Sequence, residues 1–304
     1  MKAKISCILA IVWWAALPAA AGEVTVVADV LGPEGPLYIN GNLYYVGWIS
    51  NTLSKWDGKN TIVLNHTAGC GHNGLTLTKR KTFLVACIDH GAILELSLKG
   101  KQLRRWDTDS RGRKFVGGIN DIVSAANGGA YATLFGPNTD PPTSIIGKVF
   151  YLAPGGQQWV RVANELNYAN GIGISPDQKT LYVSESVGNQ INKYAINKDG
   201  SLSNRANFAL LNVLVKNKVD SWSLGPDSMK IDSKGNIYTA QWCGGKILKI
   251  SPEGKLLHEF EIAAGDGTTN VALDDGEKEL YVTVVKDPED PQARGGVVRI
   301  ENAE

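Results

Sequence analysis

The feature that most constrains the fold of this chain is a short segment that recurs six times along it. Each copy opens on a polar residue, and apolar residues follow two and four positions later, which is the period-two alternation of a β-strand. The six opening residues are Glu34, Asn73, Asn120, Asn170, Asp227 and Thr269. A turn rich in Asp, Lys, Gly and Asn then leads to a second apolar strand, such as Leu181–Ser184 or Leu280–Thr283.

Third and fourth strands follow in most copies, and the copies begin 39 to 57 residues apart. Four strands at this spacing are typical of one blade of a β-propeller. The sequence therefore predicts an all-β fold, a six-bladed β-propeller with four-stranded blades. The last copy reaches Glu304 with only three strands, whereas Val24–Ala28 is a spare strand. We expect Val24–Ala28 to complete the last blade and close the ring, because closure removes two exposed sheet edges.

The first 21 residues have the features of a signal peptide. Lys2 and Lys4 are followed by the apolar stretch Ile5–Leu17, and Ala19–Ala21 supplies a small-residue cleavage motif before Gly22. The apolar stretch is too short to span a bilayer as a permanent helix. We therefore predict that residues 1–21 are removed and that residues 22–304 form one domain, exported to the periplasm or secreted, without a stable membrane anchor.

Composition restricts the partners of the chain. The formal net charge is +1, and no basic run exceeds the three residues Lys79–Lys81, so a nucleic acid is not an expected partner. We expect a monomer. Export permits disulfides, and Cys70 and Cys87 flank one predicted hairpin that a disulfide could bridge, while Cys243 lies in another repeat.

The opening residues also carry a chemical prediction. In a propeller the first strand of each blade lines the central channel, so symmetry brings all six opening residues to one end of it. Carboxylate and amide oxygens are ligands for hard divalent cations, and Glu34, Asn170 and Asp227 form the best set. The alternative is that these residues cap strand starts, since Asn and Asp favour turns.

The chain also resembles the senescence-marker-protein/gluconolactonase (regucalcin-like) family of six-bladed propeller lactonases. The resemblance extends over essentially the whole mature length. It rests on four motifs in order, of which the third is the most specific: Gly32–Pro36, Ile119–Asp121, Ala169–Ser184 and Gly225–Ser228.

The resemblance implies a role for individual residues. A Glu, an Asn and an Asp hold one divalent cation in the family, and they match Glu34, Asn170 and Asp227. Asn120 matches an Asn that contacts substrate or metal, and Asp121 and Ser228 also match residues of the calcium-dependent lactonases. One position departs: sugar-lactone members have a substrate-gripping Arg where this chain has Gly118. The resemblance therefore does not imply an aldonolactone substrate.

The activity implied by the resemblance is metal-dependent hydrolysis of a small-molecule lactone. Calcium is the expected ion, with magnesium, manganese and zinc as alternatives. Asp227 is the first candidate for the general base and Asp121 the second, while Asn120 would orient the substrate. His72 and Asn73 are further substrate-binding candidates at the channel mouth. Two alternatives remain open: a non-catalytic binding propeller stabilised by calcium, and a related propeller hydrolase acting on another ester.

Overall fold

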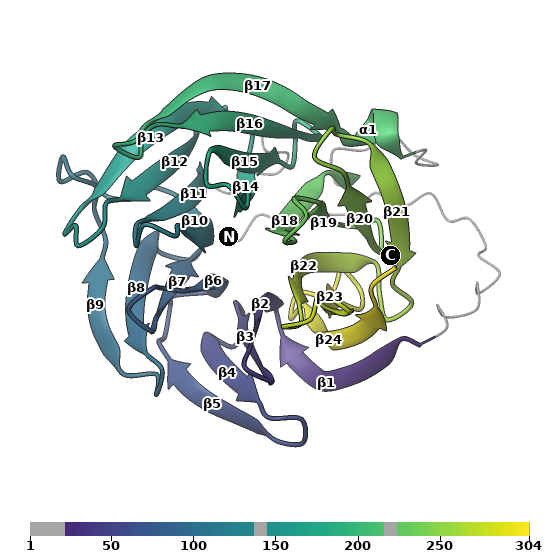
Figure 1. Cartoon of the computed structure of the whole chain (residues 1–304). Helices are drawn as coiled ribbons and strands as arrows, with labels where there is room; N and C mark the ends of the chain where they lie inside the picture. Colours follow the sequence, from purple (N-terminus) through teal and green to yellow (C-terminus); the bar gives the residue numbers. More distant parts are fainter. Residues whose placement is uncertain (1–21, 137–144, 216–223, 304) are drawn as a thin grey trace.

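The computed structural model describes residues 22–136, 145–215 and 224–303. These residues form six antiparallel sheets of four strands each and one short helix. The sheets are arranged around a common axis as the blades of a β-propeller, which confirms the predicted fold class (Figure 1). The predicted signal peptide, residues 1–21, lies outside the described residues.

The strands of each blade follow one another from the axis outward, except in the last blade. Blades 1 to 3 consist of β2 (Pro33–Ile39), β3 (Asn42–Gly47), β4 (Thr52–Trp56) and β5 (Thr61–His66); β6 (His72–Leu77), β7 (Thr82–Cys87), β8 (Ala92–Ser97) and β9 (Gln102–Trp106); and β10 (Gly118–Ser124), β11 (Ala130–Gly136), β12 (Gly147–Leu152) and β13 (Trp159–Leu166). Blades 4 and 5 consist of β14 (Ala169–Ile174), β15 (Thr180–Glu185), β16 (Gln190–Ile196) and β17 (Leu202–Leu210); and β18 (Pro226–Ile231), β19 (Ile237–Gln241), β20 (Lys246–Ile250) and β21 (Leu256–Glu261), with helix α1 (Leu211–Leu214) between them.

Blade 6 is made from both ends of the described chain. Its order is β22 (Gly267–Leu273), β23 (Glu279–Val285), β24 (Arg294–Glu301) and then β1 (Val24–Leu31). Strand β1 pairs antiparallel with β24 in the register Val24↔Arg299. The expected closure of the ring by the strand at Val24–Ala28 is therefore confirmed, and both edges are paired as Figure 1 shows.

The hydrophobic core lies between neighbouring blades. Leu84 and Ile93 of blade 2, for example, pack in one cluster with Ile122 and Phe150 of blade 3. Fully burying a side chain of this size contributes about 1.5–3 kcal/mol. The apolar residues two positions after five of the six opening residues belong to these clusters, so the repeat pattern found in the sequence is largely the packing pattern between blades.

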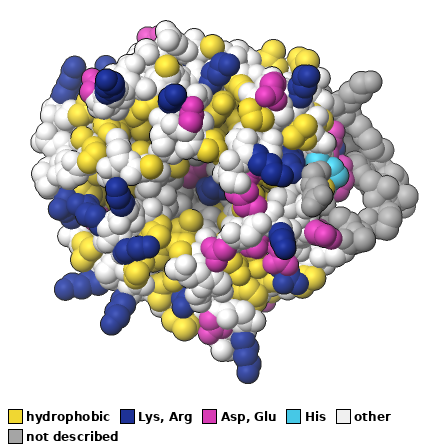
Figure 2. Space-filling view, viewed as in Figure 1, with side chains coloured by type: hydrophobic (Ala, Val, Ile, Leu, Met, Phe, Trp, Pro, Cys, Tyr) yellow, Lys and Arg dark blue, Asp and Glu magenta, His cyan; other side chains and the backbone are white. Residues whose placement is uncertain are grey.

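The inner strands approach one another closely around the axis. Gly171 on β14 shows how close: a Cβ at this position would lie 2.6 Å from the carbonyl oxygen of Asp227 and 2.6 Å from the Cα of Ser228. Only glycine fits between these backbones without displacing β18. The face of the molecule shown in Figure 2 is hollowed near its centre, and acidic and basic side chains are interspersed over it.

Two further features complete the fold. A disulfide joins Cys70 to Cys87 across the start of blade 2, with the two Cα atoms 4.6 Å apart, so the pairing considered from the sequence is formed. Among the described residues, no helix has the length and apolar character needed to cross a bilayer.

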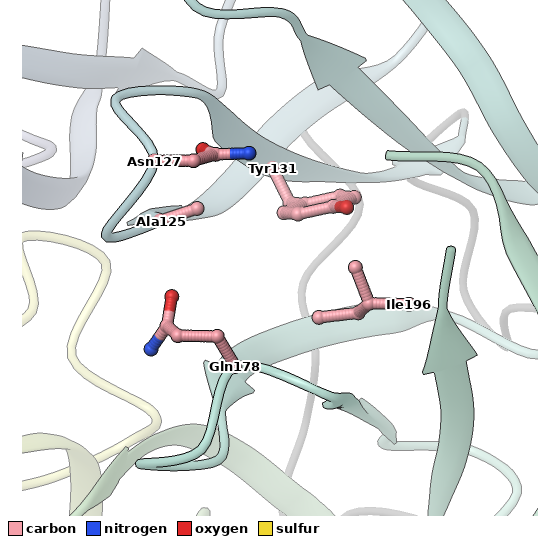
Figure 3. A pocket seen from close by; sticks show the side chains of 5 residues that line it. All are labelled: Ala125, Asn127, Tyr131, Gln178 and Ile196. Atoms are coloured by element: carbon pink, nitrogen blue, oxygen red, sulfur yellow. The ribbon is translucent and has the colours of Figure 1, made fainter. Parts of the chain in front are cut away.

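A small pocket of about 60 Å³ lies between blades 3 and 4. Asn127 and Gln178 approach it from opposite sides in Figure 3, and the hydroxyl of Tyr131 donates a hydrogen bond to the carbonyl of Gly200 (2.9 Å). The pocket follows the end of β10, opposite to Asn120 at its start. It is therefore separate from the end of the channel where the opening residues meet.

Candidate active site

The opening residues of the repeat stand at the start of the inner strands and are largely withdrawn from solvent. Glu34, Asn73, Asn120 and Asn170 are all buried. The amide nitrogen of Asn73 donates hydrogen bonds to the backbone oxygen and to Oδ1 of Asn120 (3.0 and 3.2 Å). Neighbouring blades are thus joined directly through these polar side chains, as the propeller symmetry predicts.

The carboxylate of Glu34 is held from three sides. Its Oε2 accepts a hydrogen bond from Nδ2 of Asn270 (2.7 Å) and another from the backbone N–H of Gly35. Its Oε1 accepts a hydrogen bond from the hydroxyl of Ser228 (3.3 Å). Residues of blades 5 and 6 therefore orient a carboxylate that belongs to blade 1.

Asn170 and Asp227 stand on the adjacent inner strands β14 and β18. The amide nitrogen of Asn170 donates to the hydroxyl of Ser186 (3.0 Å), which fixes the orientation of the amide. Oδ1 of Asn170 is buried and accepts no hydrogen bond from any residue that the structure describes. Because a buried carbonyl oxygen without a partner is unfavourable, this atom is set up to bind a cation or a donor from outside the chain.

Hydroxyl groups on the second strands fix the backbone of Asn170 and Asp227. Ser184 on β15 donates to the carbonyl of Asp227 (2.8 Å), and Thr133 on β11 donates to the carbonyl of Asn170 (2.5 Å). Each hydroxyl reaches from one blade to the opening residue of the next. This arrangement fixes the spacing of blades 3, 4 and 5 at the level of the site.

The carboxyl groups of Glu34 and Asp227 both have raised pKa values. Burial, and then the negative charge of Asp121, raise the pKa of Glu34 to about 7, although the hydrogen bond from Asn270 opposes the shift. Burial and the charge of Glu34 raise the pKa of Asp227 well above its ordinary value. A pair of carboxyls in this state favours either a proton or a cation between them.

Asp121 is placed differently from Asp227. It is fully buried, and its carboxylate accepts backbone hydrogen bonds from Ile122 (2.8 Å) and Ile172 (3.4 Å). Burial raises the pKa of Asp121, and the charge of Lys230 and the hydrogen bond of Ser228 oppose the rise. Asp227 keeps partial exposure to solvent. Of the two candidate bases, Asp227 is therefore the one with access to a ligand in the channel.

Two residues selected from the sequence point away from this set. His72 is fully buried, and its Nε2 lies 3.0 Å from Oδ1 of Asn65 on the outermost strand of blade 1. Burial and the charge of His66 lower the pKa of His72 to about 4. Thr269 donates its hydroxyl to the carbonyl of Pro33 (2.8 Å), so it joins blade 6 to blade 1 as a backbone contact.

Two residues close to Glu34, Asn270 and Lys230, were not identified from the sequence. Nζ of Lys230 lies 3.4 Å from Oδ1 of Asn270, and Asn270 in turn bonds Glu34. The signal that locates Asn270 is a pairing irregularity: β22 and β23 shift register between Thr268 and Asn270. Similar shifts occur at the opening residues of the other inner strands, and the residue after the opening residue contacts Glu34 in two of them, through Ser228 and Asn270.

The donor set fits a hard divalent cation. Glu34 and Asp227 supply two carboxylates, and Asn170 supplies the amide oxygen that no described residue satisfies. No group of three or more His, Cys, Asp or Glu side chains with metal-binding geometry occurs in the described part of the chain. A cation at this position would therefore depend on the amide oxygen as well as on the carboxylates.

Comparison with known proteins places this geometry in context. Residues 32–286 match the model of the SMP-30/gluconolactonase/LRE-like region. The lactonase drp35 of Staphylococcus aureus is 30% identical over 149 residues, which are 49% of this chain and 43% of that protein. The corresponding lactonase of Staphylococcus epidermidis is 30% identical over 165 residues, 54% of this chain and 47% of that protein. The chain thus spans about half the length of these curated relatives.

Solved structures share the fold along nearly the whole chain. A gluconolactonase from Xanthomonas campestris is 23% identical with a TM-score of 0.72, and the match covers 99% of this chain and 98% of that one. A calcium-binding regucalcin from Agrobacterium tumefaciens is 18% identical with a TM-score of 0.71, over 92% and 94% of the two chains. At these identities the likeness concerns the fold.

Proposed function

The chain belongs to the SMP-30/gluconolactonase/LRE-like family, and from this premise we propose that it hydrolyses a lactone with the help of one divalent cation. The observation that supports the proposal most directly is that Glu34 lies close enough to Asp227 to raise its pKa, while Oδ1 of Asn170 has no hydrogen-bond partner among the described residues. Calcium is the proposed ion, since it favours carboxylate and carbonyl oxygens. The relatives named as lactonases give the substrate class.

The proposed roles follow from the position of each side chain. Glu34, Asn170 and Asp227 would hold the cation, which would supply Lewis-acid polarisation of the lactone carbonyl. Asp227 removes a proton from the attacking water as its oxygen bonds the carbonyl carbon, and the same proton passes to the ring oxygen when the ring C–O bond breaks. Asn73 holds Oδ1 of Asn120, which leaves the amide nitrogen of Asn120 to donate to a substrate oxygen.

The experiment is a hydrolysis screen of lactones with protein stripped by a chelator and then supplied with calcium, magnesium, manganese or zinc. We expect no turnover without metal and recovery with calcium. Failure to open any lactone with any of the ions would refute the enzymatic proposal and favour a binding propeller.

A substitution tests the site independently of turnover. Asp227→Ala should abolish calcium binding measured by calorimetry, while the circular dichroism spectrum of the propeller stays the same. The matched control is Asp199→Ala, because Asp199 lies in an exposed turn where it accepts hydrogen bonds from Ser201. Unchanged calcium affinity in Asp227→Ala would refute the ligand assignment.

We also propose that the protein is exported and works as a monomer. The leader-like sequence before Gly22 and the Cys70–Cys87 disulfide both suit an oxidising compartment. Mass spectrometry of protein from the periplasm or medium should give a mature N-terminus at Gly22, and size-exclusion chromatography should give the mass of one chain.

A further inference from the structure

The loop that joins blade 2 to blade 3, residues 107–117, presents a charged and an apolar side chain on its outer side. Phe115 is 4% exposed and packs edge-to-face on Phe150 of β12, with ring centroids 5.0 Å apart. Lys114 forms a β-bridge with Thr108, so the chain is extended here. Because side chains alternate along extended chain, Lys114 and Val116 turn outward, and both are exposed, Val116 to 65%.

The shape of this loop is fixed by hydrogen bonds within the molecule. The buried carboxylate of Asp109 accepts hydrogen bonds from the backbone N–H groups of Arg111 (2.9 Å) and Arg113 (3.1 Å). The backbone N–H of Ser110 donates to the carbonyl of Trp159 (2.8 Å), which begins β13. The loop is therefore anchored to blade 3, and its outward side chains stand in place before any partner arrives.

Two more exposed aliphatic residues lie close to Val116. Ile145 and Ile146 precede β12 and are 58% and 40% exposed. Cγ1 of Ile146 lies 2.8 Å from the place of the missing Cβ of Gly136, and a Cβ on Gly117 would meet the carbonyl oxygen of the same Gly136. Gly136 thus lies between Ile146 and the segment of Val116. The three aliphatic side chains are gathered at the end of blade 3 where β10 begins.

The cations of the loop are only partly neutralised. Its two carboxylates already form salt bridges with Arg105 and Arg113 (2.8 and 2.5 Å). These salt bridges leave Arg111 and Lys114, which are both exposed, without a carboxylate partner in the described part of the chain. Net positive charge therefore stands beside the exposed aliphatic residues.

Blade 3 adds further cations to the same surroundings. Lys148 follows Ile146 by two residues on β12, and Arg161 on β13 is paired with Phe150. Burial, and then the positive charges of Arg161 and Arg113, lower the pKa of Lys148. These cations repel one another, so an anionic surface beside them is favourable. We give the name rim patch to Arg111, Lys114, Val116, Ile145, Ile146 and Lys148.

We propose that the rim patch docks the protein reversibly on a membrane surface that contains anionic lipids. Aliphatic side chains enter the boundary between headgroups and acyl chains, while neighbouring lysine and arginine side chains are attracted to the lipid phosphates. A nucleic acid or another soluble polyanion would attract the cations but would leave the aliphatic side chains in water. Docking of this kind goes beyond the proposed hydrolysis and does not depend on it.

Flotation with phospholipid vesicles tests the inference, in buffer without free calcium so that the ion cannot bridge carboxylates to lipid. The two kinds of vesicle are pure phosphatidylcholine and phosphatidylcholine with about one-third phosphatidylglycerol. We expect binding to the anionic vesicles to be stronger by at least about fivefold, the effect of one basic side chain near such a surface. This binding should weaken as salt is raised, because salt screens the attraction.

Single substitutions locate the surface. Arg111→Gln and Lys114→Gln should each weaken binding to anionic vesicles about fivefold, and Val116→Ser should weaken it by removing apolar contact with the bilayer. The matched controls are Lys234→Gln, in the exposed turn after β18, and Val63→Ser, on the outer strand β5 where Val63 is 58% exposed. Both controls should bind vesicles like the wild type.

Two results would overturn the inference: equal binding of the wild type to both kinds of vesicle, or an equal loss of binding in the rim-patch variants and the controls. Inorganic phosphate separates a lipid surface from a site for one anion. At constant ionic strength, about 10 mM phosphate should leave vesicle binding unchanged, and displacement would show a discrete anion site instead. No lactone is present in these measurements, so they stand or fall separately from the proposed hydrolysis.

Discussion

Nδ2 of Asn270 lies 2.7 Å from Oε2 of Glu34, so blade 6 orients a proposed metal ligand of blade 1. Nζ of Lys230 approaches Oδ1 of the same amide (3.4 Å), which favours the amide orientation that donates to Glu34. Blade 6, which β1 completes, therefore supplies the amide that orients Glu34.

Replacing Asn270 by Ala should weaken calcium binding about 10- to 100-fold, the usual effect of losing a hydrogen bond to a metal ligand. Calorimetry measures this affinity directly. Asn197→Ala is the control, since Asn197 bonds Ser201 in an exposed turn of blade 4. Equal calcium affinity in both variants would show that Asn270 does not orient Glu34.

The raised pKa of Glu34 predicts how the metal-free protein responds to pH. Its pKa is about 7 in the folded state, above the ordinary value of 4.5, so between these values the folded protein binds more protons than the unfolded chain. Stability must therefore fall as pH rises through this window. We expect a Tm about 5 °C lower at pH 8 than at pH 5.

Two comparisons isolate the contribution of Glu34. Glu34→Gln has no carboxyl to titrate, so its Tm should change less over the same pH range. Calcium should raise the Tm of the wild type more at pH 8 than at pH 5, because the cation competes with the proton. An identical pH dependence of Tm in the wild type and Glu34→Gln would contradict the assignment.

How far the sequence predicts this molecule depends on the alternation of its strands. The apolar period of two gave the blades and the closing strand, because residues such as Ile122 and Met229 pack between blades as the pattern requires. Strict alternation fails at the opening residues, where each inner strand shifts register against its neighbour. These irregularities turn Ser228 and Asn270 toward Glu34.

Side chains that depend on such irregularities or on distant neighbours could not be found from the pattern. His72 illustrates the second case: its position beside Asn73 suggested the channel mouth, but its ring turns to Asn65 on β5. Phe135 illustrates it again, since only the folded chain shows that its ring fills the space beside Gly118. The repeat predicts which backbone positions are equivalent in the six blades. The chemical role of a side chain at such a position depends on its contacts with the neighbouring blades.

We therefore expect His72 to affect the stability of the fold rather than substrate binding. Its lowered pKa of about 4, against an ordinary 6.5, means that the unfolded chain binds more protons between these values, so this residue destabilises the fold as pH falls through the window. His72→Gln should keep kcat and KM within about twofold and cost about 1–2 kcal/mol at neutral pH. It should also lose less stability than the wild type between pH 7 and pH 5.

Urea unfolding at the two pH values measures these differences, and steady-state kinetics at neutral pH measures the activity. A large increase in KM with unchanged stability would show instead that His72 contributes to substrate binding.

Gly171 gives the most direct test of the spacing between inner strands. A Cβ here would lie 2.6 Å from the carbonyl oxygen of Asp227 and 2.6 Å from the Cα of Ser228. These are backbone atoms, so Gly171→Ala must displace β18 rather than rotate a side chain. We expect a loss of about 1–3 kcal/mol in stability and, because Asp227 moves with its strand, a loss of at least tenfold in calcium affinity.

Gly276→Ala is the matched control, because the nearest atom to its Cβ is Oδ2 of the Asp274 side chain at 3.3 Å, in the turn before β23. This variant should bind calcium like the wild type. If Gly171→Ala loses stability but keeps its calcium affinity, the contact between β14 and β18 does not set the position of Asp227 as a calcium ligand. Loss of both together ties the proposed metal site to the close approach of the inner strands.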